Sequence, residues 1–229
     1  RYPHTIDTTF EDKIIMPGFI DPHLHPSMAS VILPMQFITA LEWKLPWGTS
    51  PAVGSREAYL EALASHASEP NDAPFFTWGY HRDWHGNITR PDIDAICPDR
   101  PVIVWHRSFH EVIMNSAALA HFNLQTDAIA AHPQIDLPAG KFFETGLRLA
   151  IAALNPVLMS PEPFGLGMAR LKQVAHFGGH TLVGDMGIGI FNFDMEWQAA
   201  CASLDAPDTP FRVHCTPNIL ALTPTGDFD

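Results

Sequence analysis

Residues 17–26 read PGFIDPHLHP, and this stretch carries the strongest indication of fold and chemistry in the chain. Successive side chains of an extended strand point to opposite faces. His23 and His25 can therefore face one point in space while Leu24 faces away. A turn at residues 17–18, a lead-in strand over residues 13–16 and a buried strand at residues 19–20 are the elements that this pattern predicts.

Two imidazoles that converge on one point suit a metal ion, with zinc as the first candidate. The His-x-His spacing alone also fits two ordinary histidines at a strand end. The carboxylate of Asp21, two residues before His23, is expected to hold a ligand histidine or the turn rather than bind the metal itself.

The composition narrows the class of protein. The chain has 229 residues, of which 46% are hydrophobic, so it can bury a sizeable core. Its formal net charge of −12 argues against nucleic acid or an anionic membrane surface as a partner. No apolar run is long enough for a transmembrane helix. Three scattered cysteines fit a reducing compartment, so we expect a cytoplasmic protein.

The order of apolar runs and helical stripes alternates between strand and helix, which indicates an α/β fold with a mainly parallel sheet. Further strands are predicted over residues 75–79, 101–105, 181–185 and 211–215. Helices are predicted over residues 56–67, 90–97, 117–122, 162–177 and 193–204. Residues 124–140 are predicted to be irregular.

The full string Pro-Gly-Phe-Ile-Asp-x-His-x-His resembles the first-strand signature of the amidohydrolase superfamily. Residues 78–79, 90–102, 110 and 114–119 extend the resemblance to one branch, the YtcJ-like metal-dependent hydrolases grouped with N-substituted formamide deformylases. The resemblance spans residues 13–215. It implies a (β/α)8 TIM barrel, of which this chain would hold the first five or so strands.

The resemblance also implies a metal site. His23 and His25 would bind one or two Zn²⁺ ions, or another divalent transition metal, and Glu144 would be a carboxylate ligand. Glu144 ends the element Gly140-Lys141-Phe142-Phe143-Glu144 and could equally be a surface glutamate at a helix start.

Two further residues are candidates for catalysis. His110 follows the strand that ends at residue 105, where it could contact substrate or be a structural histidine bonded to the backbone. Asp185 ends a strand at the edge where barrel enzymes place function, or it caps the following turn. His214 is a weaker candidate, and His81 and His85 are expected to be solvated loop histidines.

The implied activity is hydrolysis of an amide or another C–N bond in a small-molecule substrate by metal-activated water, an EC 3.5-type reaction. Later ligands and a catalytic aspartate that the superfamily uses are not found in this sequence. The alternative is therefore a truncated barrel fragment, non-catalytic or self-associating, that keeps part of a metal site.

Both ends of the chain suggest a piece of a longer protein. Residues 1–16 are expected to be a linker or the tail of an accessory β domain, and residues 17–229 a partial barrel. A partial barrel exposes open strand edges and apolar faces, so a homo-oligomer or aggregation is expected.

Overall fold

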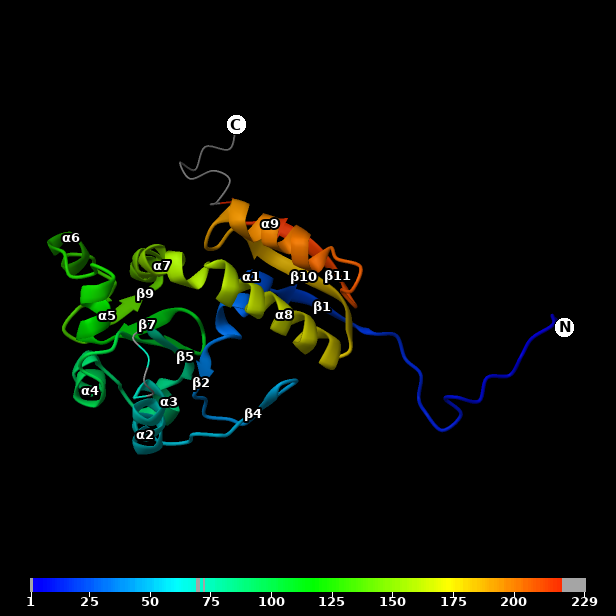
Figure 1. Ribbon diagram of the computed structural model, residues 1–229, viewed down its shortest axis with the longest axis horizontal. Helices are drawn as coiled ribbons and strands as arrows, with labels where there is room; N and C mark the ends of the chain where they lie inside the picture. Colours follow the sequence, from blue (N-terminus) through cyan, green and yellow to red (C-terminus); the bar gives the residue numbers. More distant parts are fainter. Residues whose placement is uncertain (1, 69–70, 72, 220–229) are drawn as a thin grey trace.

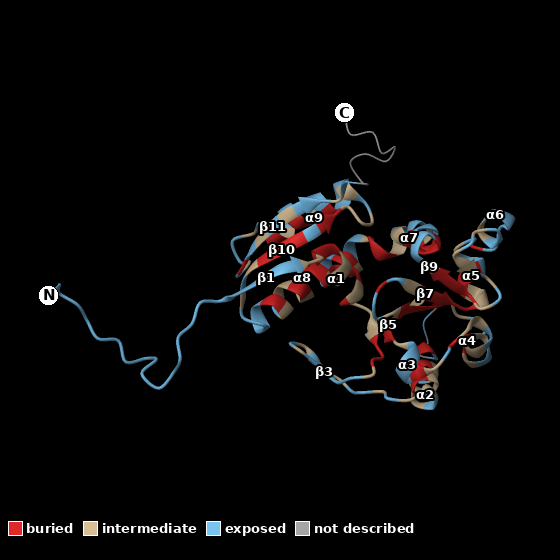
Figure 2. Ribbon diagram, turned by 180° about the vertical axis from the view of Figure 1, so that it is seen from behind, coloured by how far each residue is buried: buried red, intermediate tan, exposed pale blue. Residues whose placement is uncertain are grey.

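The computed structural model describes residues 2–68, 71 and 73–219, and these form two larger sheets with their own helices and one separate two-stranded sheet (Figure 1). Residues 2–18 contain no helix or strand, are exposed throughout, and extend away from both sheets (Figure 2). The lead-in strand predicted over residues 13–16 is therefore wrong. Those residues have no neighbouring strand with which to pair, and apolar content alone does not make a strand.

The first sheet carries the His-x-His stretch and is entirely parallel. Its order is β1–β10–β11, and its strands are β1 (Phe19–Leu24), β10 (His180–Ile188) and β11 (Arg212–Pro217). Three helices pack against it, namely α1 (Pro26–Ile32), α8 (Pro161–Phe177) and α9 (Phe193–Leu204). Val183 on the central strand is 1% exposed, so the sheet and its helices share a core.

The second sheet is mixed and has the order β2–β5–β6–β7–β9–β8. Its first three strands are parallel and the others antiparallel. The strands are β2 (Gln36–Phe37), β5 (Phe75–Tyr80), β6 (Val102–His106), β7 (Glu111–Met114), β8 (Ile135–Asp136) and β9 (Lys141–Phe143). The helices between α1 and α8 are α2 (Arg56–Ala67), α3 (Arg82–His85), α4 (Arg90–Ile96), α5 (Ser116–His121), α6 (Asp127–Ala130) and α7 (Glu144–Leu158).

A separate hairpin, β3 (Trp43–Leu45) and β4 (Gly48–Ser50), lies between β2 and α2 in the chain.

The partition of strands between two sheets corrects the expectation of about five successive barrel strands. Five of the six predicted strands exist, but β5 and β6 belong to the second sheet. Phe19 and Ile20 of β1, predicted to be buried, are 52% and 64% exposed, because this face of the first sheet has no covering layer among the described residues. Only three strands share the sheet of the histidines, and the described residues form no closed barrel. The alternation of strands and helices predicts the elements but not which strands pair. All strands of the second sheet lie between β1 and β10 in the chain, yet β1 pairs with β10, with Ile20 opposite Leu182.

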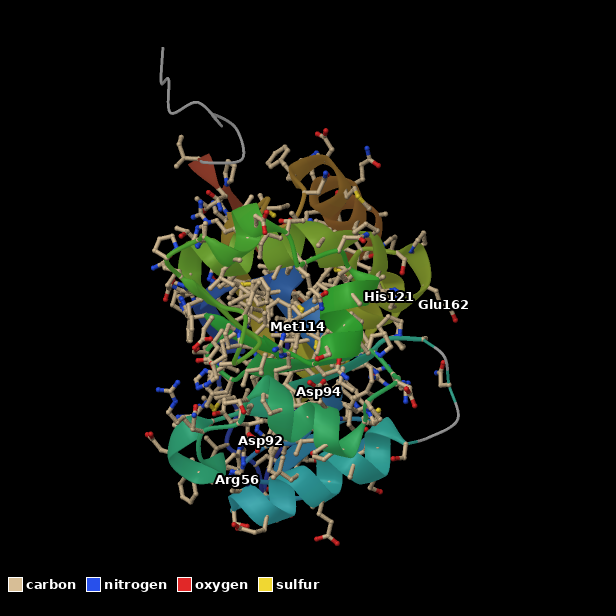
Figure 3. The ribbon with its side chains drawn as sticks, turned by 90° about the vertical axis from the view of Figure 1, so that its left-hand side faces the viewer. Arg56, Asp92, Asp94, Met114, His121 and Glu162 are labelled. Atoms are coloured by element: carbon tan, nitrogen blue, oxygen red, sulfur yellow. The ribbon has the colours of Figure 1, made fainter. Side chains whose placement is uncertain are left out.

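The helix start predicted at residue 56 is confirmed, and a cap stabilises it. Ser55 accepts a hydrogen bond from the backbone N–H of Ala58 at the start of α2, at 3.2 Å. An ion pair of 2.6 Å between Arg56 and Asp92 then ties α2 to α4 (Figure 3).

No helix among the described residues combines the length and the apolar character that crossing a membrane requires.

Candidate metal centre

The two histidines of the opening motif lie next to each other at the carboxyl end of β1. Their ring centroids are 5.2 Å apart and their planes are nearly perpendicular, at 89°. His23 is the exposed member of the pair, and His25 is half-buried at the start of α1. The backbone N–H of His23 donates to a carboxylate oxygen of Asp21 at 3.0 Å, so Asp21 holds the turn that presents both rings.

His25 has the properties of a metal ligand. Its Nδ1 atom is buried and has no hydrogen-bond partner among the described residues. Burial lowers the pKa of His25, and the neighbouring charge of His23 lowers it further. The ring is therefore neutral near pH 7, which is the form of imidazole that binds metal. A buried nitrogen without a partner is costly, and a bound ion would remove that cost.

His110 and Glu144 form a second pair. His110 Nδ1 lies 3.2 Å from Glu144 Oε2, and the backbone N–H of Glu144 donates to the carbonyl of His110 at 3.3 Å. Glu144 is the first residue of α7, as the helix-start reading anticipated, and its φ is +41°. A positive φ is strained for a residue with a side chain, and such strain often marks a functional position.

A cavity of about 640 Å³ brings three of the five predicted site residues together. His25 lines it from just after β1, His110 from just before β7, and Glu144 from the start of α7. Across residues 2–68, 71 and 73–219, however, no group of three or more His, Cys, Asp or Glu side chains is arranged to hold a metal ion. The cavity thus brings His25, but not His23, to the same space as the pair of His110 and Glu144.

Asp185 does not line this cavity. It lies on β10 between Leu24 of β1 and Cys215 of β11, and it is 2% exposed. Burial raises its pKa to about 6, and Glu196 adds to the rise, while the hydrogen bond from the N–H of Gly187 opposes it. That hydrogen bond, 3.0 Å long, matches the turn-capping alternative.

Helix α7 supplies residues that the sequence reasoning missed. Leu147, Ile151 and Asn155 line the cavity at helical spacing after Glu144. Asn155 donates through Nδ2 to the carbonyl of Phe191 at 3.1 Å, while its Oδ1 is buried without a partner among the described residues. The apolar stripe from residue 147 onward was the available signal, and Pro156 inside the helix obscures it.

Neither His85 nor His214 lines the cavity. His85 is fully buried, which corrects the expectation of a solvated loop residue. Its Nδ1 accepts from the N–H of His81 at 3.0 Å, so Nε2 is left to donate to the carbonyl of Val53 at 2.8 Å. His214 is exposed on β11.

Comparison with known proteins gives a family match over most of the chain. The model of a family described as "Amidohydrolase family" matches residues 10–216. A Bacillus subtilis (strain 168) protein named as an amidohydrolase, YtcJ, is 25% identical over 168 residues, which are 68% of this chain and 29% of that protein.

Two solved structures are similar in fold, and both are called uncharacterized metal-dependent hydrolases. The one from Pyrococcus horikoshii OT3 has a TM-score of 0.62 and 20% identity, over 92% of this chain and 38% of its own. The one from Pyrococcus furiosus has a TM-score of 0.59 and 22% identity, over 93% and 41%. The chain thus spans less than half the length of each of these relatives.

Proposed function

This chain belongs to the amidohydrolase family, and we propose that it forms part of a metal-dependent hydrolase that acts on an amide or another C–N bond of a small molecule. The observation that carries the proposal is the buried, unpartnered Nδ1 of His25, next to His23 and at the wall of a cavity large enough for a substrate. Zinc, or another divalent transition metal, would supply a Lewis acid that lowers the pKa of water and polarises the scissile carbonyl.

The chain's own residues have separate roles in this proposal. His23 and His25 would hold the ion through neutral imidazole nitrogens. The carboxylate of Glu144 would serve as a further ligand or accept a proton, with His110 Nδ1 at 3.2 Å to share that proton. Asp185, with a pKa of about 6, is able to exchange a proton near neutral pH, although from outside the cavity.

We further propose that β1, β10 and β11 are three neighbouring strands of a (β/α)8 barrel. Their parallel order, with helices packed against the sheet, is the arrangement of a barrel wall. His23 and His25 lie at the carboxyl end of β1, the end at which barrel enzymes place their active sites. Among the described residues, β1 and β11 each pair on one side only, so both edges are free to continue such a sheet.

A second candidate remains, a non-catalytic or self-associating barrel fragment with part of a metal site. The absence of a three-ligand group among the described residues favours it.

A hydrolysis screen separates the two candidates. The protein, supplied with Zn²⁺, is assayed on N-acyl amino acids and N-substituted formamides, beside His25→Gln and a control, His121→Gln, which changes an exposed histidine on α5. We expect turnover by the wild type and the control, and none by His25→Gln. Turnover that survives His25→Gln would refute the proposed role of the pair, and no turnover by any form would favour the fragment.

A further inference from the structure

The carboxylate of Glu196 is a buried group to which the proposed hydrolytic chemistry gives no role. Glu196 lies in the first turn of α9 and is fully buried. No ion pair found within the described residues includes it. Burying a carboxylate is costly unless hydrogen bonds replace the water that it loses, so the groups that bind Glu196 indicate what it does.

Three backbone N–H groups donate to this carboxylate. The N–H of Gly189 donates to Oε2 at 2.7 Å, and those of Phe191 and Asn192 donate to Oε1 at 2.6 and 2.9 Å. Asn192 is the N-cap of α9, and its bond to a glutamate in the first turn is the kind of contact that caps helices. Gly189 and Phe191 lie before the helix, so Glu196 also fixes the turn of residues 189–192, which joins β10 to α9 (Figure 1).

This turn borders the candidate metal centre. Residues 189–191 line the same cavity as His25. The strand that leads into the turn passes close to the His25 ring, because a Cβ atom added to Gly187 would lie 3.6 Å from its Cε1 and Nδ1 atoms. Glu196 itself does not line the cavity, so it can act on a bound molecule only through the turn.

The turn gives the cavity apolar side chains. Ile190 and Phe191 contribute to the lining from the turn, and Leu147 and Ile151 contribute from α7. A hydrogen bond of 3.1 Å from Asn155 Nδ2 to the carbonyl of Phe191 ties the turn to α7. The apolar part of the wall is thus built from two joined elements, and one of them keeps its shape through Glu196.

We propose that Glu196 is a positioning residue that holds the turn of residues 189–192 as a wall of the cavity, and that this wall selects substrates with an apolar group beside the scissile amide. Hydrogen bonds to an ionised carboxylate are stronger than those to a neutral acceptor, which suits a group that must fix a turn. The inference rests on the proposed function, because it names the kind of substrate that the site accepts.

The test is calorimetric titration of the metal-free protein with hexanamide and with butanamide, which is shorter by two methylene groups. Because no metal is present, the result does not depend on hydrolysis. We expect the wild type to bind hexanamide about tenfold more tightly, since two buried methylene groups contribute about that factor.

Glu196→Gln replaces one acceptor oxygen by an amide nitrogen, so at least one N–H of the turn loses its partner. The preference for hexanamide should then fall to about threefold or less, with the stoichiometry unchanged. A substitution that only unfolded part of the protein would do the opposite. It would lower the stoichiometry for both amides and leave the preference as it is.

The control is Glu162→Gln, which makes the same change at an exposed glutamate in the first turn of α8 and should keep the wild-type preference (Figure 3). Circular dichroism checks the fold of each variant. If Glu196→Gln unfolds, Gly189→Ala takes its place. The φ of Gly189 is +100°, which alanine adopts poorly, so this change displaces the turn and should also reduce the preference.

The proposal is overturned if the wild type binds neither amide, if it does not prefer hexanamide, or if the preference survives in the folded turn variant. Such a result beside successful hydrolysis would reject the role of Glu196 and leave the proposed function intact. Conversely, a preference that depends on Glu196 supports the inference even if no substrate is hydrolysed.

Discussion

Asp185 is a carboxyl group that water barely reaches, and its ionisation must work against folding. Burial raises its pKa to about 6 in the folded protein, against about 3.9 for an aspartate in an unfolded chain. Between those values the folded state holds more protons than the unfolded state. Stability therefore falls as pH rises through this window and is level above it.

We predict that Asp185→Asn removes this loss. The wild type, freed of metal by a chelator, should lose on the order of 2–3 kcal/mol of unfolding free energy between about pH 4 and pH 6, since each pKa unit is worth about 1.4 kcal/mol. The variant should not show this loss. Asparagine keeps an acceptor for the N–H of Gly187. Urea unfolding of both proteins across pH 4–8 measures the difference, and parallel curves would contradict the raised pKa.

For single residues, the sequence predicts where a site residue lies along a strand better than it predicts which side chains surround that residue. The alternation of a strand is a local property, so the adjacency of His23 and His25 follows from it. The burial of Asp185 and of His85 depends on segments distant in the chain, such as β1 beside Asp185 and Tyr59 beside His85, and no local pattern specifies them.

Asn115 illustrates how one residue joins several elements. Its Oδ1 accepts from the N–H of Val102 and of Ala118, both at 2.9 Å, and its Nδ2 donates to the carbonyls of Cys97 and Arg100. The side chain is fully buried. It thus caps α5, extends the start of β6 and closes the end of α4 at once.

We predict that Asn115→Ala destabilises the protein by on the order of 3 kcal/mol or more, because three buried hydrogen bonds to backbone groups and a fourth, part-buried one are lost. The matched control is Thr126→Ala, which removes the cap of the short helix α6, a helix without buried residues. That variant should cost about 1 kcal/mol or less. Urea denaturation compares the two, and equal losses would show that the Asn115 network adds nothing beyond a cap.

Elements with local signals were predictable, and α7 was not. Ser55 and Asn115 are residues of the kind that cap helices, and they predict the helices that follow them. The β-branched residues of β6 predict that strand. Helix α7 has no cap hydrogen bond at its start and has Pro156 near its end, so both of the usual boundaries are absent.

The arrangement of the whole molecule depends on the pairing of β1 with β10, which the sequence does not predict. About 150 residues separate β1 from β10 in the chain, yet these strands are neighbours. Predicting which strands pair requires the three-dimensional packing of the intervening sheet. The sequence therefore predicts the strands but not the sheet to which each strand belongs.

The open first sheet predicts self-association. Phe19 and Ile20 on β1 are 52% and 64% exposed, and Met186 on β10 is 39% exposed. Exposed apolar groups on a sheet with free edges favour contact between copies. Sedimentation should show a mass that rises with concentration, and Ile20→Lys should reduce it.

The control for that experiment is Leu149→Lys, which adds the same charge at a position of α7 that is 41% exposed. Its mass should follow the wild type. A wild-type protein that stays monomeric at every concentration would contradict the prediction.

The proposed metal site of His23 and His25 can be checked through the metal content of the protein. Elemental analysis of the purified wild type is compared with His23→Ala/His25→Ala and with a control that removes two exposed histidines, His121→Ala/His176→Ala. We predict about one zinc or other transition-metal ion per chain in the wild type and the control, and none in the first variant. A wild type without metal, or a metal content that the first variant retains, would contradict the claim.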